Sequence, residues 1–153
     1  TPLYRRIQGD VPEERYPVPF GQARVHRECD DAVVVTWGAM VHTANEAAGE
    51  LAKEDFEVEV LDLRTIIPWD RARVLESVRR TSKVLVLHED TRTGGFGGEI
   101  AATIAEEAFE DLDAPVMRVA APDSPVPFSP PLEKAFIPQV EDVTKALRNL
   151  AAY

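Results

Sequence analysis

Four runs of mostly apolar residues divide the chain at regular intervals. They lie at residues 32–37, 57–61, 83–87 and 116–120, and the first (AVVVTW) and third (KVLVL) have few polar positions. A continuous apolar run of this kind is typical of a strand that is covered on both faces of a sheet. A short polar stretch at residues 24–27 suits a strand at a sheet edge. The pattern therefore predicts five strands.

Helical periodicity fills the intervals between these strands. Residues 39–53 are rich in alanine with one apolar side, and residues 70–80 begin at Asp70, which stands where an N-cap is expected. We expect a third helix over residues 98–111. Its predicted apolar stripe consists of Ile100, Ala101, Ile104, Ala108 and Phe109.

The last part of the chain combines prolines with one more helix. Residues 122–131 carry five prolines, which predict an extended surface loop because proline has no backbone N–H to donate. Pro138 is then expected to open a closing helix that runs to about Leu150.

The alternation of strands and helices predicts the fold class. It implies parallel strands joined by right-handed crossovers, with helices on both faces of the sheet. The polar strand at residues 24–27 is expected to pair antiparallel at one edge. The predicted fold is therefore α/β, a three-layer α/β/α sandwich around a five-stranded mixed sheet with an antiparallel edge strand.

Residues 1–21 do not share the periodicity of the rest. They hold four prolines and begin with Thr1 rather than methionine. Their apolar residues are Leu3, Tyr4, Ile7, Tyr16 and Phe20. We interpret residues 1–21 as an extended arm or linker from a missing upstream domain, and residues 22–153 as one folded domain. The alternative is an ordinary disordered tail.

Composition and charge narrow the possible partners. The 153 residues are enough for one domain, with 44% hydrophobic and 29% charged residues. The net charge of −10 argues against nucleic acid, whose phosphates repel such a surface. No apolar run approaches the roughly 20 residues of a membrane span, and the N-terminal residues lack the apolar core of a signal peptide. Cys29 is the one cysteine, which fits a reducing compartment.

Two connectors between strand and helix carry the most specific pattern. One is LDLRTIIPWD at residues 61–70, and the other is HEDTRTGGFGGEI at residues 88–100. Together they resemble the C-terminal domain of the beta subunit of the thiamine-diphosphate-dependent 2-oxo acid dehydrogenases, a transketolase C-terminal-type domain. The likeness is strongest to the branched-chain (2-oxoisovalerate) enzyme and covers nearly the whole chain. It implies the same fold as the pattern of strands and helices.

The sequence signal for a catalytic or ligand-binding site in these connectors is weak. Residues 94–98 offer backbone N–H groups at a helix start, as a phosphate site does. They lack both the P-loop lysine and the full dinucleotide fingerprint. The alternative is that these glycines serve tight turns and close backbone packing. His88 lies at a strand end beside Glu89, where acid–base chemistry or a polar interface are both open. Asp62 and Arg64 flank Leu63 and suggest an ion pair or a backbone brace.

The resemblance implies that the intact enzyme uses thiamine diphosphate and magnesium. The Gly-Asp-Gly segment that binds the metal in the family has no match here, since Gly9-Asp10 is followed by Val11. We therefore expect no catalytic, cofactor-binding or metal-binding residue in this chain. The implied role is contact with an alpha subunit and a second beta subunit, and we place His88, Glu89 and Phe96 at the subunit interface.

An acidic run, EEAFEDLD at residues 106–113, follows at the end of the third predicted helix. Negative charge is unfavourable there because the helix macrodipole is already negative. The run is either a solvated acidic face or a docking site for a basic partner. In the family, the small basic peripheral-subunit-binding domain of the acyltransferase core docks near an acidic residue before Ala-Pro and near the terminal carboxylate. By that resemblance we assign docking to Asp113, Tyr153 and Glu110.

The resemblance implies a C-terminal assembly domain of a 2-oxo acid dehydrogenase beta subunit, which works in the cytoplasm of a bacterium or archaeon or in the mitochondrial matrix. A branched-chain substrate is favoured for the intact enzyme. The alternatives are the same domain of a pyruvate dehydrogenase, a fragment of a transketolase or deoxyxylulose-phosphate synthase, and a stand-alone nucleotide- or flavin-binding module.

Overall fold

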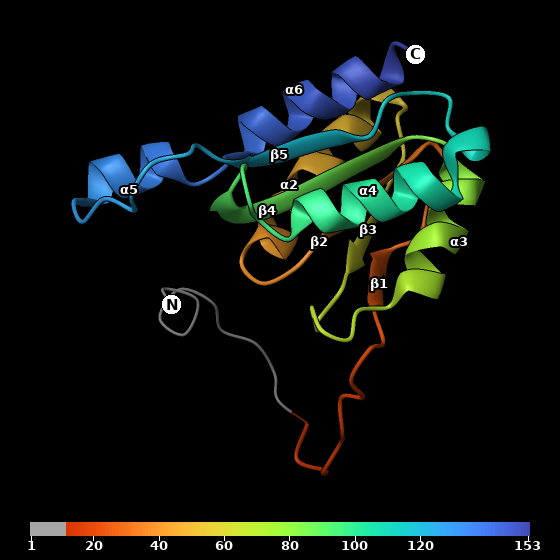
Figure 1. Ribbon diagram of the computed structural model, residues 1–153, viewed down its shortest axis with the longest axis horizontal. Helices are drawn as coiled ribbons and strands as arrows, with labels where there is room; N and C mark the ends of the chain where they lie inside the picture. The colour runs from red at the N-terminus through yellow and green to blue at the C-terminus, as the bar shows by residue number, and fades with distance from the viewer. Residues whose placement is uncertain (1–11) are drawn as a thin grey trace.

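The apolar runs form the strands of a single five-stranded sheet in the computed structural model, which describes residues 12–153. The strands are β1 (Arg24–Arg27), β2 (Ala32–Thr36), β3 (Val58–Asp62), β4 (Val84–Thr91) and β5 (Met117–Ala121). Their order across the sheet is β1-β3-β2-β4-β5 (Figure 1). Strand β1 pairs antiparallel with β3, and the other neighbours are parallel. The predicted mixed sheet with an antiparallel edge strand is confirmed.

Helices cover both faces of the sheet (Figure 1). The α-helices are α2 (Met40–Leu51), α3 (Arg71–Thr81), α4 (Gly97–Glu107), α5 (Pro130–Phe136) and α6 (Val140–Ala151). Two 3₁₀ turns follow α2 and α4, namely η1 (Ala52–Glu54) and η2 (Phe109–Asp111). Helices α2 and α6 share one hydrophobic cluster with the sheet, while α3 and α4 share a second cluster on the opposite face. The predicted three-layer sandwich is therefore confirmed.

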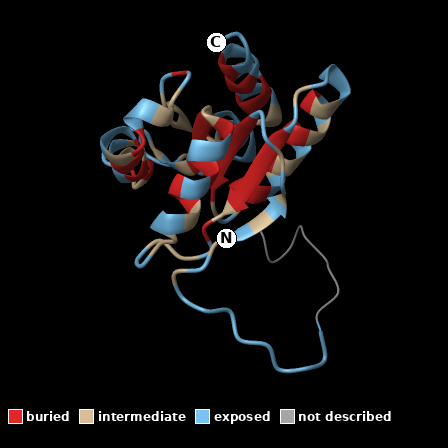
Figure 2. Cartoon of the chain, turned by 90° about the vertical axis from the view of Figure 1, so that its right-hand side faces the viewer, coloured by how far each residue is buried: buried red, intermediate tan, exposed pale blue. Residues whose placement is uncertain are grey.

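The core lies on both sides of the central strand β2. All five residues of β2 are fully buried, because β3 and β4 flank it and helices cover both its faces. Figure 2 shows the buried positions concentrated on the sheet and on the helix surfaces that face it. None of the helices in residues 12–153 has the length and apolar character that crossing a bilayer requires.

Two local predictions around the third helix were wrong. Strand β4 continues to Thr91, beyond the predicted end at residue 87, because Thr91 pairs with Ala121 of β5. The predicted helix over residues 98–111 is interrupted: α4 ends at Glu107, and Ala108 leaves the helical conformation with a φ of −134°. The break rotates Phe109 out of the predicted apolar stripe, and its side chain is 73% exposed.

The proline-rich segment also departs from prediction. Pro130 and Pro131 occupy the first turn of α5 rather than an extended loop. Proline is tolerated there because the first N–H groups of a helix have no partner within it. The closing helix begins at Val140 instead of Pro138, with Gln139 and Asp142 forming a reciprocal capping box.

The described part of the predicted arm is extended. Within it, the side chains of Tyr16, Val18 and Phe20 are exposed. Leu3, Tyr4 and Ile7 lie outside the described residues. The division into an arm at residues 1–21 and a domain at 22–153 stays a prediction.

Candidate functional site

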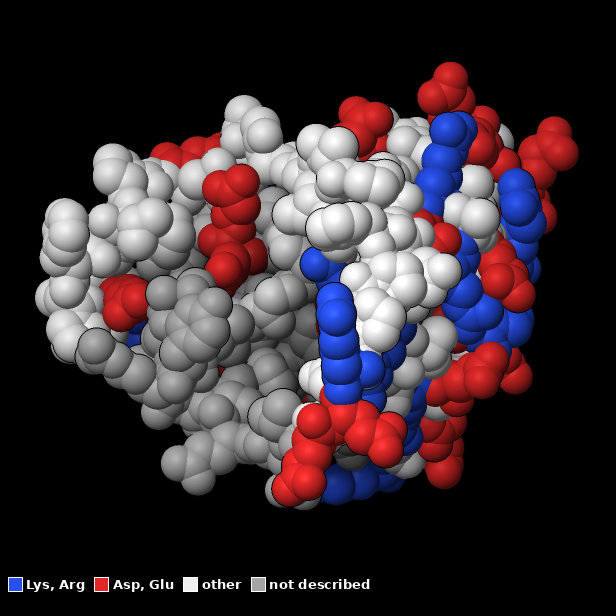
Figure 3. Space-filling view, turned by 90° about the horizontal axis from the view of Figure 1, so that it is seen from below, with Lys and Arg blue, Asp and Glu red and all other residues white. Residues whose placement is uncertain are grey.

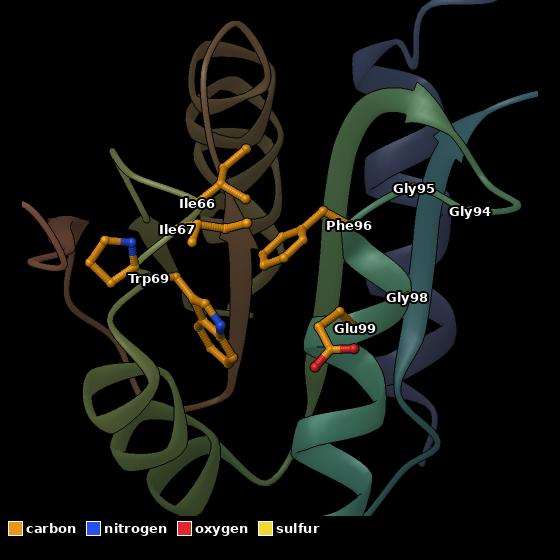
Figure 4. A pocket seen from close by; sticks show the side chains of 9 residues that line it. Ile66, Ile67, Trp69, Gly94, Gly95, Phe96, Gly98 and Glu99 are labelled. Atoms are coloured by element: carbon orange, nitrogen blue, oxygen red, sulfur yellow. The ribbon is translucent and has the colours of Figure 1, made fainter.

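The connectors after β3 and β4 lie on the same edge of the sheet, because the carboxyl ends of parallel strands meet there. They border an open pocket of about 670 Å³. It is lined by Ile66, Ile67, Pro68, Trp69, Gly94, Gly95, Phe96, Gly98 and Glu99. Figure 4 shows Ile67 and Trp69 on one side of the opening, with Phe96 and Glu99 on the other. The pocket is largely apolar, and Glu99 is the one charged side chain among the described residues that line it.

Hydrogen bonds hold the first connector in shape. The Oδ1 atom of Asp62 accepts from the backbone N–H of Arg64 at 3.0 Å, where Arg64 has a φ of +59°. The hydroxyl of Thr65 donates to the carbonyl of Pro68 at 2.7 Å and accepts from the N–H of Gly21 at 2.8 Å. Of the two roles predicted for Asp62 and Arg64, the structure shows the backbone brace.

Asp70 ends this connector and makes two contacts. Its Oδ1 accepts from the N–H of Arg73 at 3.2 Å, which confirms the predicted N-cap of α3. Its Oδ2 accepts from the N–H of Ala23 at 2.9 Å. Together, Thr65 and Asp70 fix the point at which residues 21–23 enter the domain.

The second connector lies over the side chain of His88. This imidazole is fully buried in β4 and stacks on the indole of Trp37, with ring centroids 5.4 Å apart and an interplanar angle of 6°. A Cβ atom on Gly95 would lie 2.8 Å from the Cε1 of His88, and one on Gly97 would overlap the ring even more closely. The predicted close backbone packing is confirmed, because only glycine lets the loop lie on this ring.

His88 has no hydrogen-bond partner for either ring nitrogen among the described residues. Burial lowers the pKa of His88 below its ordinary value, which favours the neutral form. Its side chain has no exposed surface in this chain, so contact with another subunit would act through the loop above it. The sequence predicts a polar interface residue at the end of a strand; the structure shows a buried side chain within the strand.

The three predicted interface residues do not lie together. His88 supports the loop that carries Phe96, which is half-buried and meets Trp37 edge-on at 6.3 Å. Glu89 points to the opposite side of β4, where it lines a separate pocket of about 650 Å³ with Glu46 and Glu133. Alternation along a strand explains the separation.

The acidic run is partly neutralised by α3. Glu107 forms an ion pair with Arg71, and Asp111 pairs with Arg79 at 3.4 Å. The run therefore has basic neighbours in space that are distant in sequence. Within residues 12–153, no ion pair is formed by the remaining carboxylates, Glu106, Glu110 and Asp113.

Glu110 and Asp113 border a pocket of about 560 Å³. The N–H of Asp113 donates to the carbonyl of Ser82 at 2.9 Å, which fixes the chain just before β5. Ala114 shares a hydrophobic cluster with Leu150, near the end of α6. Helix α6 runs back from the carboxyl edge of the sheet, so Tyr153 lies at the same end of the molecule as Asp113 (Figure 1). The structure therefore places the three predicted docking residues at one end.

One buried carboxylate was missed by sequence analysis. Glu59 lies in the middle of β3 with no exposed surface. It accepts a hydrogen bond from the hydroxyl of Ser77 at 2.5 Å and pairs with Arg80. These contacts hold α3 to the sheet. On the face of the molecule drawn in Figure 3, basic and acidic side chains are interleaved and do not form a field of one sign.

Comparison with known proteins gives the family. The family model described as "Transketolase, C-terminal domain" matches residues 21–143. This chain belongs to the transketolase C-terminal domain family. The resemblance seen in the two connectors is confirmed. A solved structure titled "Split gene transketolase, inactive beta4 tetramer" matches with a TM-score of 0.78 and 28% identity, over 95% of this chain and 46% of that one.

Curated relatives of this transketolase C-terminal domain include beta subunits of two kinds of 2-oxo acid dehydrogenase. The 2-oxoisovalerate dehydrogenase subunit beta of Bacillus subtilis is 44% identical over 151 residues, which are 98% of this chain and 46% of the relative. The pyruvate dehydrogenase E1 component subunit beta of the same organism is 40% identical over 151 residues, 99% of this chain and 46% of the relative. The chain thus spans about half the length of these relatives.

Replacement of Gly97 by alanine tests the contact with His88. The new methyl group would overlap the imidazole, so Gly97→Ala should lower the free energy of unfolding by about 1–3 kcal/mol. Gly49→Ala is the matched control, because no atom from outside the surrounding backbone of α2 lies within 4 Å of the added Cβ. That control should raise the free energy of unfolding by about 0.5–1 kcal/mol. Urea denaturation of the purified domain measures both, and equal effects of the two changes would refute the contact.

The burial of His88 also predicts a dependence on pH. In the unfolded chain a histidine binds its proton near pH 6.5 (about the model-peptide value), whereas the folded chain binds it only at lower pH. The unfolded state therefore binds more protons as the pH falls from about 7 through the folded pKa, and stability declines. The His88→Asn variant should lose less stability over this range than the wild type. Parallel stability curves for the two proteins would contradict this assignment.

Proposed function

We propose that this chain is the C-terminal assembly domain of a 2-oxo acid dehydrogenase beta subunit. The observation that carries the proposal is its similarity, over nearly its whole length, to beta subunits of the 2-oxoisovalerate and pyruvate enzymes. In the intact enzyme, a 2-oxo acid would be decarboxylated on thiamine diphosphate and the acyl group passed to a lipoyl arm. The domain itself would hold subunits together and dock the enzyme to its acyltransferase core.

The acidic side chains of the described residues are poorly suited to a magnesium ion. Magnesium prefers several oxygen ligands in octahedral geometry. Within residues 12–153, no three histidine, cysteine or acidic side chains gather in a way that holds a metal ion, and the pocket at the carboxyl edge has Glu99 as its one carboxylate. We therefore assign thiamine diphosphate and magnesium to other parts of the intact enzyme.

The surface formed by the two connectors, residues 61–70 and 88–100, is our candidate for contact with the alpha subunit and the second beta subunit, and we call it the connector surface. Its pocket is apolar, and the side chain of Ile67 at its rim is 85% exposed. Phe96 lines the same pocket, and His88 holds its loop in place. The extended arm with Phe20 enters the domain beside this connector. Glu89 would contribute from the other side of β4.

The end of the molecule that carries the acidic run at residues 106–113, which we call the acidic end, is our candidate for docking to the basic peripheral-subunit-binding domain. Asp113 and Glu110 would pair with its arginine and lysine side chains, and Tyr153 would contact it beside them. The structure supports this because Glu110 and Asp113 form no ion pair within the described residues. A basic partner would relieve the repulsion among carboxylates at the end of α4.

A branched-chain substrate is our preferred assignment for the intact enzyme, because the connector sequences resemble that enzyme most. The pyruvate enzyme is the second candidate, since one of its beta subunits is 40% identical to this chain. A soluble setting in the bacterial or archaeal cytoplasm, or in the mitochondrial matrix, follows from either assignment.

Surface plasmon resonance with the acyltransferase's binding domain tests the docking role in the full-length enzyme. Loss of one member of a charge pair leaves the other unpaired, so Asp113→Ala should weaken binding by about 10- to 100-fold. Deletion of Ala152 and Tyr153 should also weaken it. Glu106→Ala is the matched control: it removes the same charge about two turns back along the chain and should matter less.

The salt dependence of these complexes distinguishes docking from a solvated acidic face. Wild-type affinity should fall as salt rises, mostly through slower association. Equal affinities for the wild type and Asp113→Ala, with no salt dependence, would return the acidic run to the role of a solvated face.

A further inference from the structure

The proposed docking surface around Glu110 and Asp113 also contains an exposed aromatic ring, and charge pairing with a basic partner gives that ring no role. Phe109 lies in η2, within the acidic run at residues 106–113, and its side chain is 73% exposed. We propose that Phe109 is the apolar anchor of this surface, and that the partner inserts an aliphatic side chain flanked by basic residues. The inference rests on the proposed docking function and adds a determinant of specificity to it.

Phe109 stands at the edge of a pocket with a suitable lining. The pocket of about 560 Å³ is formed by Ala105, Phe109, Glu110, Leu112, Asp113, Ala114, Pro115 and Val116. Six of these side chains are apolar, and Glu110 and Asp113 are the two charged ones. An apolar centre with a charged rim is the usual anatomy of a specific interface. The composition therefore fits a partner whose apolar side chain is surrounded by positive charge.

The backbone turn that carries Phe109 is held in place before any partner arrives. The N–H of Asp111 donates to the carbonyl of Ala108 at 3.0 Å, and the N–H of Leu112 donates to Phe109 at 3.3 Å. The ion pair of Asp111 with Arg79, at 3.4 Å, ties the turn to α3. Binding to a side chain on a fixed backbone turn costs less conformational entropy than binding to one on a mobile loop.

The ion pairs of the acidic run sort its residues into two groups. Glu107 and Asp111 face α3 and are neutralised by Arg71 and Arg79. Glu110 and Asp113 border the pocket and form no ion pair within residues 12–153. The fold thereby leaves uncompensated negative charge beside Phe109, in a chain whose net charge is already −10. An acidic partner would be repelled, whereas a basic one is attracted.

A second exposed phenylalanine provides the matched control. Phe128 is 103% exposed, and it lies in the segment between β5 and α5, away from η2 (Figure 1). It does not line the pocket beside Asp113. If exposure of an aromatic ring alone mattered, Phe128→Ala and Phe109→Ala would have similar effects.

The test uses the full-length enzyme and the binding domain of its acyltransferase, with plasmon resonance at several salt concentrations. Phe109→Ala should weaken binding by about tenfold, mainly through faster dissociation, because interface anchors act on the dissociation rate. The slope of log Kd against log salt should match that of the wild type, since no charge is lost. Asp113→Ala should make this slope shallower. Phe128→Ala should leave both affinity and slope unchanged.

The possible failures are separable. If wild type binds, Asp113→Ala weakens binding and Phe109→Ala does not, the anchor is refuted while the docking function stands. If wild type shows no binding at all, the proposed function fails and this inference fails with it. If Phe109→Ala instead breaks the enzyme into smaller species in sedimentation velocity, Phe109 belongs to a subunit contact and is not a docking anchor.

Discussion

The arrangement of the connector surface depends on one contact: the backbone at two glycines packs directly against a buried pair of stacked aromatic rings. The imidazole of His88 in β4 stacks on the ring of Trp37. Gly95 and Gly97 bring the main chain directly against that imidazole. Any side chain at those two positions would lift the loop. Because α4 begins at Gly97, the same contact sets where that helix starts and which way Phe96 points.

The parallel strands then separate the two proposed surfaces. The connector pocket lies at the carboxyl ends of β3 and β4. Asp113 precedes β5 and therefore lies at the other end of the parallel strands, where their amino ends meet. Helix α6 runs back across the sheet and delivers Tyr153 to the edge that carries Asp113. A domain built in this way can contact other subunits through one edge while it docks a partner through the other.

The sequence predicted the features that local patterns encode. The central strand β2 followed from a continuous apolar run, and α3 followed from its period and the cap at Asp70. What it could not predict depends on partners distant in the chain. The extension of β4 requires pairing of Thr91 with β5, and the position of Phe109 requires a helix break that the ion pair between Arg79 and Asp111 stabilises. The burial of His88 depends on glycines seven and nine residues later in the sequence.

The most direct test of the division into two surfaces is hydrogen–deuterium exchange on the full-length enzyme, with and without the acyltransferase's binding domain. Binding should slow exchange at residues 106–116 and 150–153, and leave residues 64–70 and 92–98 unchanged. Slower exchange at residues 64–70 and 92–98, with none at 106–116, would contradict the assignment of docking to the acidic end.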